Sequence, residues 1–360
     1  MRIGWVSSAL AACALIGACA ARSDAPAGGA GGAAPASAPA GQPAASAAAA
    51  QPAPPVRVRA AYGTDSGSEA PLWIAYEAGL FTEQGLDLSL ERIAGGTSKP
   101  TQVMIAGEMD VIHGAGPALV DAQLAGADIV ALTTAQRSSG ILLYGDATVQ
   151  TLADLRGKSV AVTRAGTLSD FTIRYALTQQ SLRPEVDVGL IQTGGNAETL
   201  AAMSSGQVAG GMIAPPFDVT GRRIGFHEVF DAASLGLEFA SLGLQVQRDY
   251  LQKNSDVVQR IVRGYVAGNA RVYKDEAFTK QVIGKYTGTD DPEALDSSYQ
   301  AVARRYHQRA PYPTVVQFQS VIDFAAEREP RARELQPEKL LDDHFVRALE
   351  QDGFIDSLYQ

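Results

Sequence analysis

Hydrophobic and polar positions alternate with two different periods along the body of the chain. Residues 56–62 alternate apolar with basic side chains, and residues 86–93 alternate again, as half-buried strands do. Further strands are predicted at Val111, 129–132, 141–144, 159–162, 186–191 and 242–246. Helical patterns lie between them, among them 71–78, 167–180 and 196–205. Strands that alternate with helices predict an α/β architecture with mainly parallel sheets.

After Tyr250 the pattern is that of helices only. A set of apolar residues falls on one helical face, after a cap expected at Asn254 or Ser255. The set consists of Val257, Val258, Ile261, Val262, Tyr265 and Val266. No internal repeat with a fixed period is visible.

The chain begins like an exported protein. Met1-Arg2 precedes an apolar run at 3–16, which has the charge and length of a secretory signal rather than of a membrane span. Ile16-Gly17-Ala18-Cys19 resembles the bacterial lipobox, in which the cysteine becomes the acylated first residue of the mature protein. An ordinary signal peptide that contains a cysteine is the alternative. We expect a lipoprotein signal at 1–18 and a lipid anchor on Cys19 that holds the protein to the membrane, in the periplasm or cell envelope.

The next segment has the composition of a tether. Residues 20–55 are almost entirely Ala, Gly, Pro, Ser and Gln. Because such a segment has no large apolar side chain to bury, it cannot offset the entropy cost of ordering, and we expect a disordered tether over 19–55. No later segment has the ~20 uninterrupted apolar residues of a transmembrane helix, so membrane contact is expected only through the lipid.

Composition excludes several classes of function. The 360-residue chain has a formal net charge of −9 and no run of Lys and Arg, so we expect no binding to nucleic acid. Its only cysteines are Cys13 and Cys19, which excludes a disulfide framework, a cysteine metal site and a cysteine nucleophile in the body. The four histidines include no pair at i, i+4 spacing and no His-Glu-x-x-His motif, so we expect no metal and no cofactor.

Small polar residues gather in loops next to the predicted strands. These loops are 63–68, 95–98, 114–116, 166–170 and 194–196. In parallel α/β sheets such loops lie at the carboxyl ends of strands, where ligands bind and where helix N-termini offer unpaired N–H groups. A structural explanation stays open for each loop, since Thr167-x-x-Asp170 matches a capping box and Asn196 is a good cap by itself.

Several segments resemble the substrate-binding proteins of ABC importers, in the nitrate, sulfonate, taurine and thiamine-pyrimidine-precursor branch (the NMT1-like family). Residues 68–81 (SEAPLWIAYEAGLF) resemble the first helix of these proteins. Other similar segments are Gly107-Glu108-Met109-Asp110-Val111, 152–162, 194–197, 214–218 and 353–359. The resemblance covers essentially residues 56–359, and the combination of motifs is more specific than any one of them.

The resemblance implies a two-lobed type II periplasmic-binding fold with the ligand in the cleft. The first lobe would comprise 56–144 and 241–360, interrupted by a second lobe at 145–240. Such a protein is a monomer that captures a small organic or anionic solute by hinge closure and delivers it to an ABC permease and its ATPase. A tethered sensor or partner-recruiting module on the same fold is the alternative. The pyrimidine synthases that share this fold use a cysteine-rich motif, for which the cysteine-free body supplies no residue.

The expected ligand contacts come from the loops on the two sides of that cleft. They are Asp65, Ser66, Glu69, Gly96, Thr97, Gly116, Arg164, Thr167, Ser169, Asn196 and Phe217. Arg164 beside a helix N-terminus favours an anion such as a sulfonate or carboxylate, with a solvated loop charge as the alternative. Phe217 follows Pro215-Pro216 near the cleft, where it could stack on a flat ligand. We expect Thr97 to face Thr167 and Ser169 across the cleft.

Two further residues are weighed between core and cleft. Trp73 lies at a helix position that is aromatic in many proteins of the family, and we expect it to pack between helix and sheet. His113 ends a predicted strand at the cleft-facing edge, and we expect a satisfied structural histidine there, with a ligand contact as the alternative.

Overall fold

The structure of the protein is a computed structural model that describes residues 54–136, 138, 140–236 and 238–360. The expected signal peptide, the lipidated Cys19 and the tether up to residue 53 lie outside the described residues. Within the described ranges, no helix is both long enough and apolar enough to cross a membrane.

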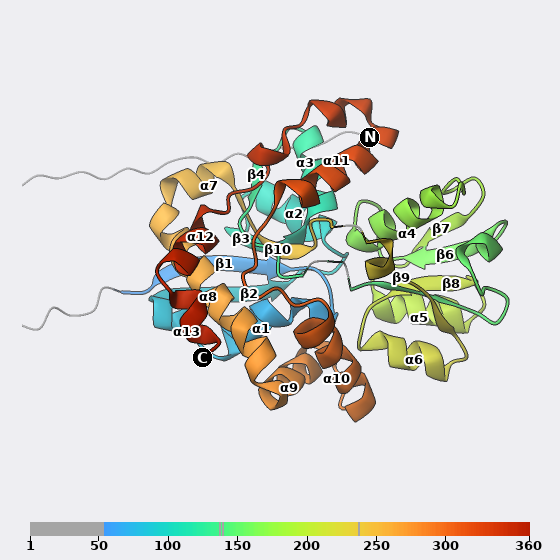
Figure 1. Cartoon of the computed structure of the whole chain (residues 1–360), viewed down its shortest axis with the longest axis horizontal. Helices are drawn as coiled ribbons and strands as arrows, with labels where there is room; N and C mark the ends of the chain where they lie inside the picture. Colours follow the sequence, from blue (N-terminus) through green and yellow to red (C-terminus); the bar gives the residue numbers. More distant parts are fainter. Residues whose placement is uncertain (1–53, 137, 139, 237) are drawn as a thin grey trace, which may run out of the picture. The chain divides into compact units, whose positions relative to one another are not determined.

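Two five-stranded sheets form the centres of two lobes (Figure 1). The first sheet has the order β2-β1-β3-β10-β4 and consists of β1 (Val56–Tyr62), β2 (Leu86–Arg92), β3 (Val111–Ala115), β4 (Ile129–Ala131) and β10 (Leu242–Gln247). The second has the order β7-β6-β8-β5-β9 and consists of β5 (Leu142–Gly145), β6 (Ser159–Val162), β7 (Gly189–Gln192), β8 (Gly210–Ile213) and β9 (His227–Asp231). The chain therefore leaves the first sheet after β4 and returns to it with β10.

The expectation of mainly parallel sheets was wrong for the strands that follow each crossing. β5 pairs antiparallel with β8 and β9, and β10 pairs antiparallel with β3 and β4, while the β1–β2, β1–β3, β6–β7 and β6–β8 pairs are parallel. A strand that enters a sheet directly from the other lobe has no crossover helix to set a parallel direction. The expected boundary at residue 145 also needs correction, because β5 at 142–145 already belongs to the second sheet.

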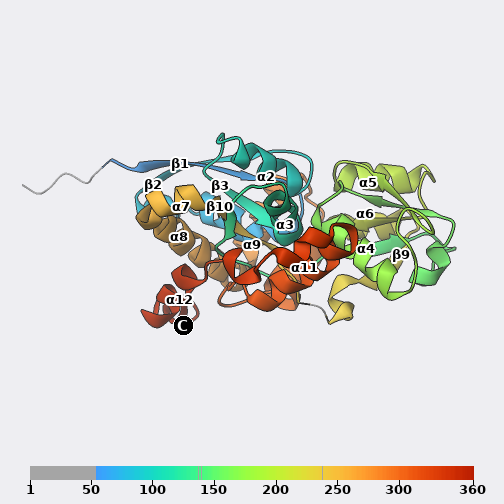
Figure 2. The same ribbon diagram turned by 90° about the horizontal axis from the view of Figure 1, so that it is seen from above.

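Helices cover both faces of each sheet (Figure 2). The helices before the first crossing are α1 (Ala70–Glu77), α2 (Ser98–Ile105) and α3 (Gly116–Leu124), and those of the second lobe are α4 (Leu168–Gln179), α5 (Asn196–Ser204) and α6 (Phe217–Arg223). The chain after β10 forms α7 (Arg248–Lys253), α8 (Ser255–Lys274), α9 (Glu276–Thr287), α10 (Pro292–Tyr299), a π-helical turn (Gln300–Arg305), α11 (Val315–Arg328), α12 (His344–Gln351) and α13 (Phe354–Leu358).

Alternation along the strands builds the core of the first lobe. Val58, Ala60 and Tyr62 pack with α1 and α8 on one face of the sheet, whereas Ala61 packs with α3 and α11 on the other. Trp73 is fully buried, as expected for a core residue. Its indole ring stacks on Tyr286, with 4.7 Å between the ring centroids.

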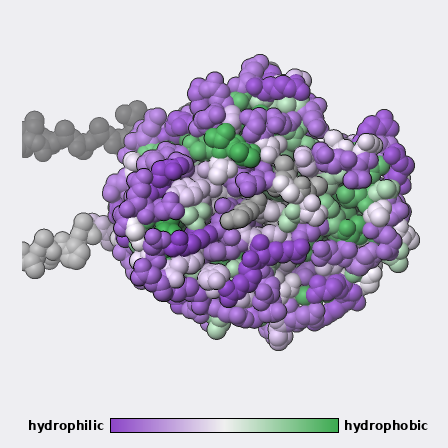
Figure 3. All heavy atoms as spheres, viewed as in Figure 1, coloured by the Kyte–Doolittle hydropathy of each residue, from purple (hydrophilic) through white to green (hydrophobic). Residues whose placement is uncertain are grey.

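Apolar contacts between α4 and α11 join the lobes. Phe171 of α4 packs edge-on against Phe324 of α11, with ring centroids 4.9 Å apart. On the face seen in Figure 3, hydrophilic residues predominate and hydrophobic ones form small patches. The polar residues on this face agree with the amphipathic patterns of the helices.

Candidate ligand-binding site

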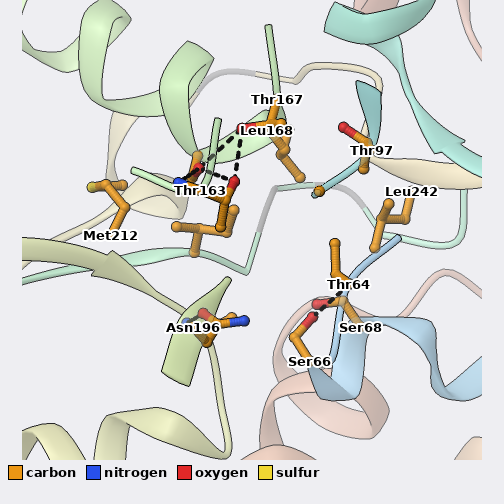
Figure 4. Close-up of a pocket in the computed structure, with 14 residues that line it drawn as sticks. Thr64, Ser66, Ser68, Thr97, Thr163, Thr167, Leu168, Asn196, Met212 and Leu242 are labelled. Carbon is orange, nitrogen blue, oxygen red and sulfur yellow. Dashed lines mark hydrogen bonds between the residues drawn. The ribbon is translucent and has the colours of Figure 1, made fainter. Parts of the chain in front are cut away.

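A pocket lies between the two sheets and takes its lining from both lobes (Figure 4). The lining consists of Thr64, Ser66, Ser68, Gly96, Thr97, Ile141, Thr163, Thr167, Leu168, Ser169, Asn196, Met212, Ala214 and Leu242. The free space measures about 30 Å³, which corresponds to about two ordered water molecules.

The lining combines hydroxyl groups with aliphatic side chains. Seven of its residues are serines or threonines and one is an asparagine, while Ile141, Leu168, Met212, Ala214 and Leu242 supply the apolar part. Among the described residues, no charged side chain and no aromatic ring belongs to the lining. Recognition in this pocket therefore rests on hydrogen bonds and apolar contact rather than on ion pairs or stacking.

Three helices begin at the pocket. Thr97 is the N-cap of α2, Thr167 is the N-cap of α4, and Asn196 is the first residue of α5 after its N-cap Gly195. Within the described chain, none of these N-caps makes a side-chain capping hydrogen bond. The first-turn N–H groups, which have no partner inside their own helices, are thus left for other acceptors, and the helix dipoles favour negative charge there.

The two caps that the sequence left open as structural alternatives are not formed. The Thr167 hydroxyl donates to the carbonyl oxygen of Arg164 at 2.6 Å, and Asp170 instead accepts from the backbone N–H of Gly166 at 3.0 Å. Asn196 donates from Nδ2 to Asp65 Oδ1 at 2.8 Å, and its Oδ1 accepts from Ala214 N–H at 3.3 Å. The side chain of Asn196 therefore links the lobes rather than capping α5.

A cluster of three hydroxyls occupies the second-lobe side of the pocket. Thr163 Oγ1 lies 2.9 Å from Thr167 Oγ1 and 2.8 Å from Ser169 Oγ, and the latter two oxygens are 3.1 Å apart. Ser169 Oγ also accepts from Thr163 N–H at 3.0 Å. Because the Thr167 proton is already donated to Arg164, the three oxygen contacts share two remaining protons. The cluster has little donor capacity left for a ligand.

Hydroxyl donors lie on the first-lobe side, and one of them has no partner within the described chain. Thr97 Oγ1 is buried and has no hydrogen-bond partner within the part of the chain that the structure describes, and the whole residue is 1% exposed. Ser66 and Ser68 line the same side, and Figure 4 shows Thr97 across the pocket from Thr167. The first lobe therefore offers hydroxyl protons, so the acceptor-rich end of a ligand fits on that side.

The pocket gathers part of the expected set of contacts. Ser66, Gly96, Thr97, Thr167, Ser169 and Asn196 belong to its lining. Asp65 lies beside it, bonded to Asn196 and within 3.4 Å of the Arg92 guanidinium. Glu69 is fully buried behind Thr64, whose hydroxyl donates to Glu69 Oε1 at 2.8 Å.

Like Asp65 and Glu69, three other expected residues (Gly116, Arg164 and Phe217) lie outside the lining. A Cβ on Gly116 would stand 2.5 Å from Ala240 Cβ, so this glycine permits close approach of two chain segments. Arg164 lies next to Gly95, whose ideal Cβ would be 3.2 Å from Arg164 Nε. Phe217 begins α6 and packs against the second-lobe core, so its ring is used for folding rather than presented to the pocket.

Sequence reasoning missed some of the lining for different reasons. Thr64 and Ser68 lie in the first of the glycine-rich loops, and Thr163 follows the last residue of β6 directly, so their positions at strand ends could have indicated them. The aliphatic members look like any core residue in the sequence. His113 is fully buried in the first lobe and is not part of the lining.

Two lobes of α/β structure with a loop-lined pocket between them define the periplasmic-binding fold of type II. The chain belongs to the NMT1/THI5-like family, whose model matches residues 67–276. Among curated proteins it is similar to YtlA of Bacillus subtilis (strain 168), with 24% identity over 276 residues that cover 71% of this chain and 78% of that protein.

Solved structures show the same fold. The alkanesulfonate-binding protein SsuA from Xanthomonas axonopodis pv. citri, bound to MOPS, has a TM-score of 0.69 and 16% identity, and the match covers 81% of this chain and 99% of that one. The periplasmic nitrate-binding protein NrtA from Synechocystis PCC 6803 has a TM-score of 0.68 and 12% identity, covering 85% and 91%.

Thr97→Val tests whether the unpaired hydroxyl serves a ligand. Valine keeps the shape and removes a buried hydroxyl without a partner, so urea denaturation should show an unchanged or higher free energy of unfolding without ligand. Affinity for a bound solute should fall by about 0.5–1.5 kcal/mol by calorimetry, or more for a charged solute.

The matched control is Thr101→Val on the same helix. Thr101 is also buried, but its hydroxyl donates to the carbonyl oxygen of Thr97 at 2.9 Å. This variant should lose about 0.5–1.5 kcal/mol of stability and keep its affinity. An equal loss of affinity in both variants would contradict a specific role for Thr97.

Proposed function

We propose that the protein is the solute-binding component of an ABC importer. It captures a small organic or anionic solute between its lobes and passes it to a membrane permease driven by an ATPase. The observation that carries the proposal is the pocket between the lobes, where three helices begin without side-chain caps. The sulfonate- and nitrate-binding proteins with the same fold support it.

The donors around the pocket indicate the class of solute. Backbone N–H groups at helix starts and the hydroxyls of Ser66, Ser68 and Thr97 suit oxygen atoms that accept several hydrogen bonds. A sulfonate, nitrate, carboxylate or pyrimidine-like ring presents such acceptors, and the aliphatic lining suits a short apolar substituent. Binding and release need no bond to be made or broken, so the proposed role is not enzymatic.

The size of the pocket supports hinge closure as part of the proposal. A free space of about 30 Å³ is far below the ~300–1,000 Å³ of small-molecule sites, so a solute enters only when the lobes separate. Polar contacts that such a motion would break include Asn196 to Asp65 at 2.8 Å, Ser297 Oγ to Asp218 at 2.6 Å and Arg222 to Glu293 at 3.0 Å. Solute binding then stabilises the closed arrangement over the open one.

A thermal-shift screen tests the function. Nitrate, methanesulfonate, taurine, acetate and aminopyrimidines are added to the full chain at graded concentrations. A solute in hundredfold excess over its Kd should add about 2.7 kcal/mol of stability. If no small solute stabilises the protein and a protein partner binds it instead, the sensor alternative replaces the transport role.

Gly96→Ala tests closure directly. Gly96 has φ +66, and a Cβ there would lie 2.6 Å from Thr167 Cγ2 across the pocket. Relief of that contact requires the lobes to stay apart at a cost of about 1–3 kcal/mol. Solute affinity should therefore fall about tenfold or more, and small-angle scattering should show a larger radius of gyration with saturating solute.

Gly107→Ala is the control for backbone strain. Gly107 has φ +79, and no heavy atom lies within 4 Å of its ideal Cβ. In both variants an alanine takes a left-handed backbone conformation, which lowers stability by about 1–2 kcal/mol. Only Gly96→Ala should change the affinity; a similar loss in Gly107→Ala would attribute the effect to strain.

The membrane anchor is a separate prediction. Cys19→Ser should move the protein from the membrane fraction to the soluble fraction of the periplasm, because it removes the expected acylation site. Solute affinity should stay unchanged, since more than 30 residues of expected tether separate Cys19 from the body. Continued fractionation with the membrane would refute the lipid anchor and leave the binding function untouched.

A further inference from the structure

A chain of hydrogen-bonded polar groups runs through the first lobe behind the pocket. Glu69 precedes α1, His113 lies in β3 and Tyr265 lies in α8, and all three are fully buried. His113 Nδ1 is hydrogen-bonded to Glu69 Oε2, and His113 Nε2 lies 2.8 Å from the Tyr265 hydroxyl. The chain thus crosses the sheet from α8 to the loop that follows β1.

The pocket end of this chain is Thr64. Its hydroxyl donates to Glu69 Oε1 at 2.8 Å, and its backbone N–H donates to the same oxygen at 3.3 Å. A carboxylate oxygen only accepts, so the direction of both bonds is fixed. Thr64 lines the pocket, yet its hydroxyl proton is already given to Glu69, and its side-chain torsion is set by that bond.

Stability alone is a weak reason for such a group of residues. Burial of a carboxylate and an imidazole costs several kcal/mol before their hydrogen bonds are counted, and well-packed apolar residues often do as well or better. Burial, together with the charge of Glu69, also raises the pKa of Tyr265 well above its usual range. Glu69, whose burial is costly, is hydrogen-bonded to Thr64 of the pocket lining. This contact indicates a role for Glu69 in the pocket.

We propose that Glu69, His113 and Tyr265 are positioning residues for Thr64. His113 holds the carboxylate of Glu69 in place, and Glu69 fixes the rotamer of Thr64 and the start of loop 63–66. Thr64 is thereby presented to the solute as an acceptor or as a methyl surface, never as a donor. The part that concerns the solute rests on the proposed function, whereas the control of Thr64 does not.

The first test needs no solute. Three-bond couplings in the NMR spectrum of the full chain report the side-chain torsion of Thr64. A single rotamer is expected for wild type, and averaging between rotamers for Glu69→Gln and His113→Gln. Glu83→Gln and His344→Gln are matched controls, since both side chains lie at exposed positions of the chain. A single Thr64 rotamer in the two core variants would overturn the proposal.

The reverse measurement covers the case in which a core variant does not fold. Thr64→Val keeps the shape of a partly exposed residue and removes one donor from Glu69. The downfield imidazole proton of His113, assigned by its loss in a histidine-substituted sample, should shift in Thr64→Val and stay in place in Thr101→Val. An unchanged His113 signal in Thr64→Val would show that the two ends of the chain are not coupled.

The last test uses methanesulfonate as the probe. Thr64→Val and His113→Gln should each weaken its binding by about two- to tenfold, and the double variant should be no weaker than the weaker single one. Independent effects would instead multiply, which would contradict action through Thr64. If methanesulfonate does not bind wild type, the solute class fails, while the two NMR measurements still decide the positioning role.

Discussion

Backbone N–H groups at the start of a helix need acceptors, and in this protein three helix starts face one pocket without side-chain caps. α2 comes from the first lobe and α4 and α5 from the second, so the requirement is shared between two bodies. Oxygen atoms placed between the lobes satisfy it from both sides at once. Neither lobe alone brings all the donors together, which is why the proposed binding of a solute would be coupled to the approach of the lobes.

The lobes can approach this closely because glycines, which have no side chain, lie at their interface. Gly96 faces Thr167, where a Cβ would have only 2.6 Å. Gly67 lies against Ser298, and its N–H donates across the interface to the carbonyl oxygen of Pro215 at 3.0 Å. Backbone-to-backbone contact of this kind transmits position with little side-chain freedom. A Cβ on Gly96 would meet Thr167 of the other lobe, whereas a Cβ on Gly67 would first meet Ser298 of its own lobe.

The strands and the site were predictable to different degrees. β1 at 56–62 and β6 at 159–162 match their predicted bounds, because period-2 alternation or a short apolar run between turn residues marks them. β8 and β9 were not predicted. β8 begins with two glycines, and β9 is only five residues long, with Val229 and Phe230 adjacent rather than alternating with polar residues, so neither has a strong local signal. The predicted parallel direction was wrong at β5 and β10. The direction of these strands depends on the route of the chain between the lobes, which no local pattern encodes.

Within the site, residues at helix starts were the predictable ones. Thr97, Thr167 and Ser169 lie where glycine-rich loops enter helices, and the fold brings them to one pocket. Arg164 and Phe217 were expected at the cleft because they lie beside a helix N-terminus and after Pro215-Pro216, but the fold places Arg164 beside Gly95 and Phe217 against the second-lobe core. The bonds that make Thr64 and Asn196 specific join residues 5 and 131 positions apart. The hydrogen bond between Asn196 and Asp65, which are 131 positions apart, can be seen only in the folded chain.

The charges around the pocket limit what it suits. Each helix N-terminus carries roughly half a positive charge, so three of them supply about one and a half. Asp65 is compensated by Arg92 at 3.4 Å, and the charge of Glu69 lies behind Thr64. What remains is a modest positive field without a single cationic side chain among the described lining residues.

Such a field suits one negative charge spread over several oxygens, or a neutral ring rich in acceptors. A doubly charged head group would need a guanidinium or ammonium partner to offset its desolvation, and the lining supplies only hydroxyls, an amide and backbone N–H groups.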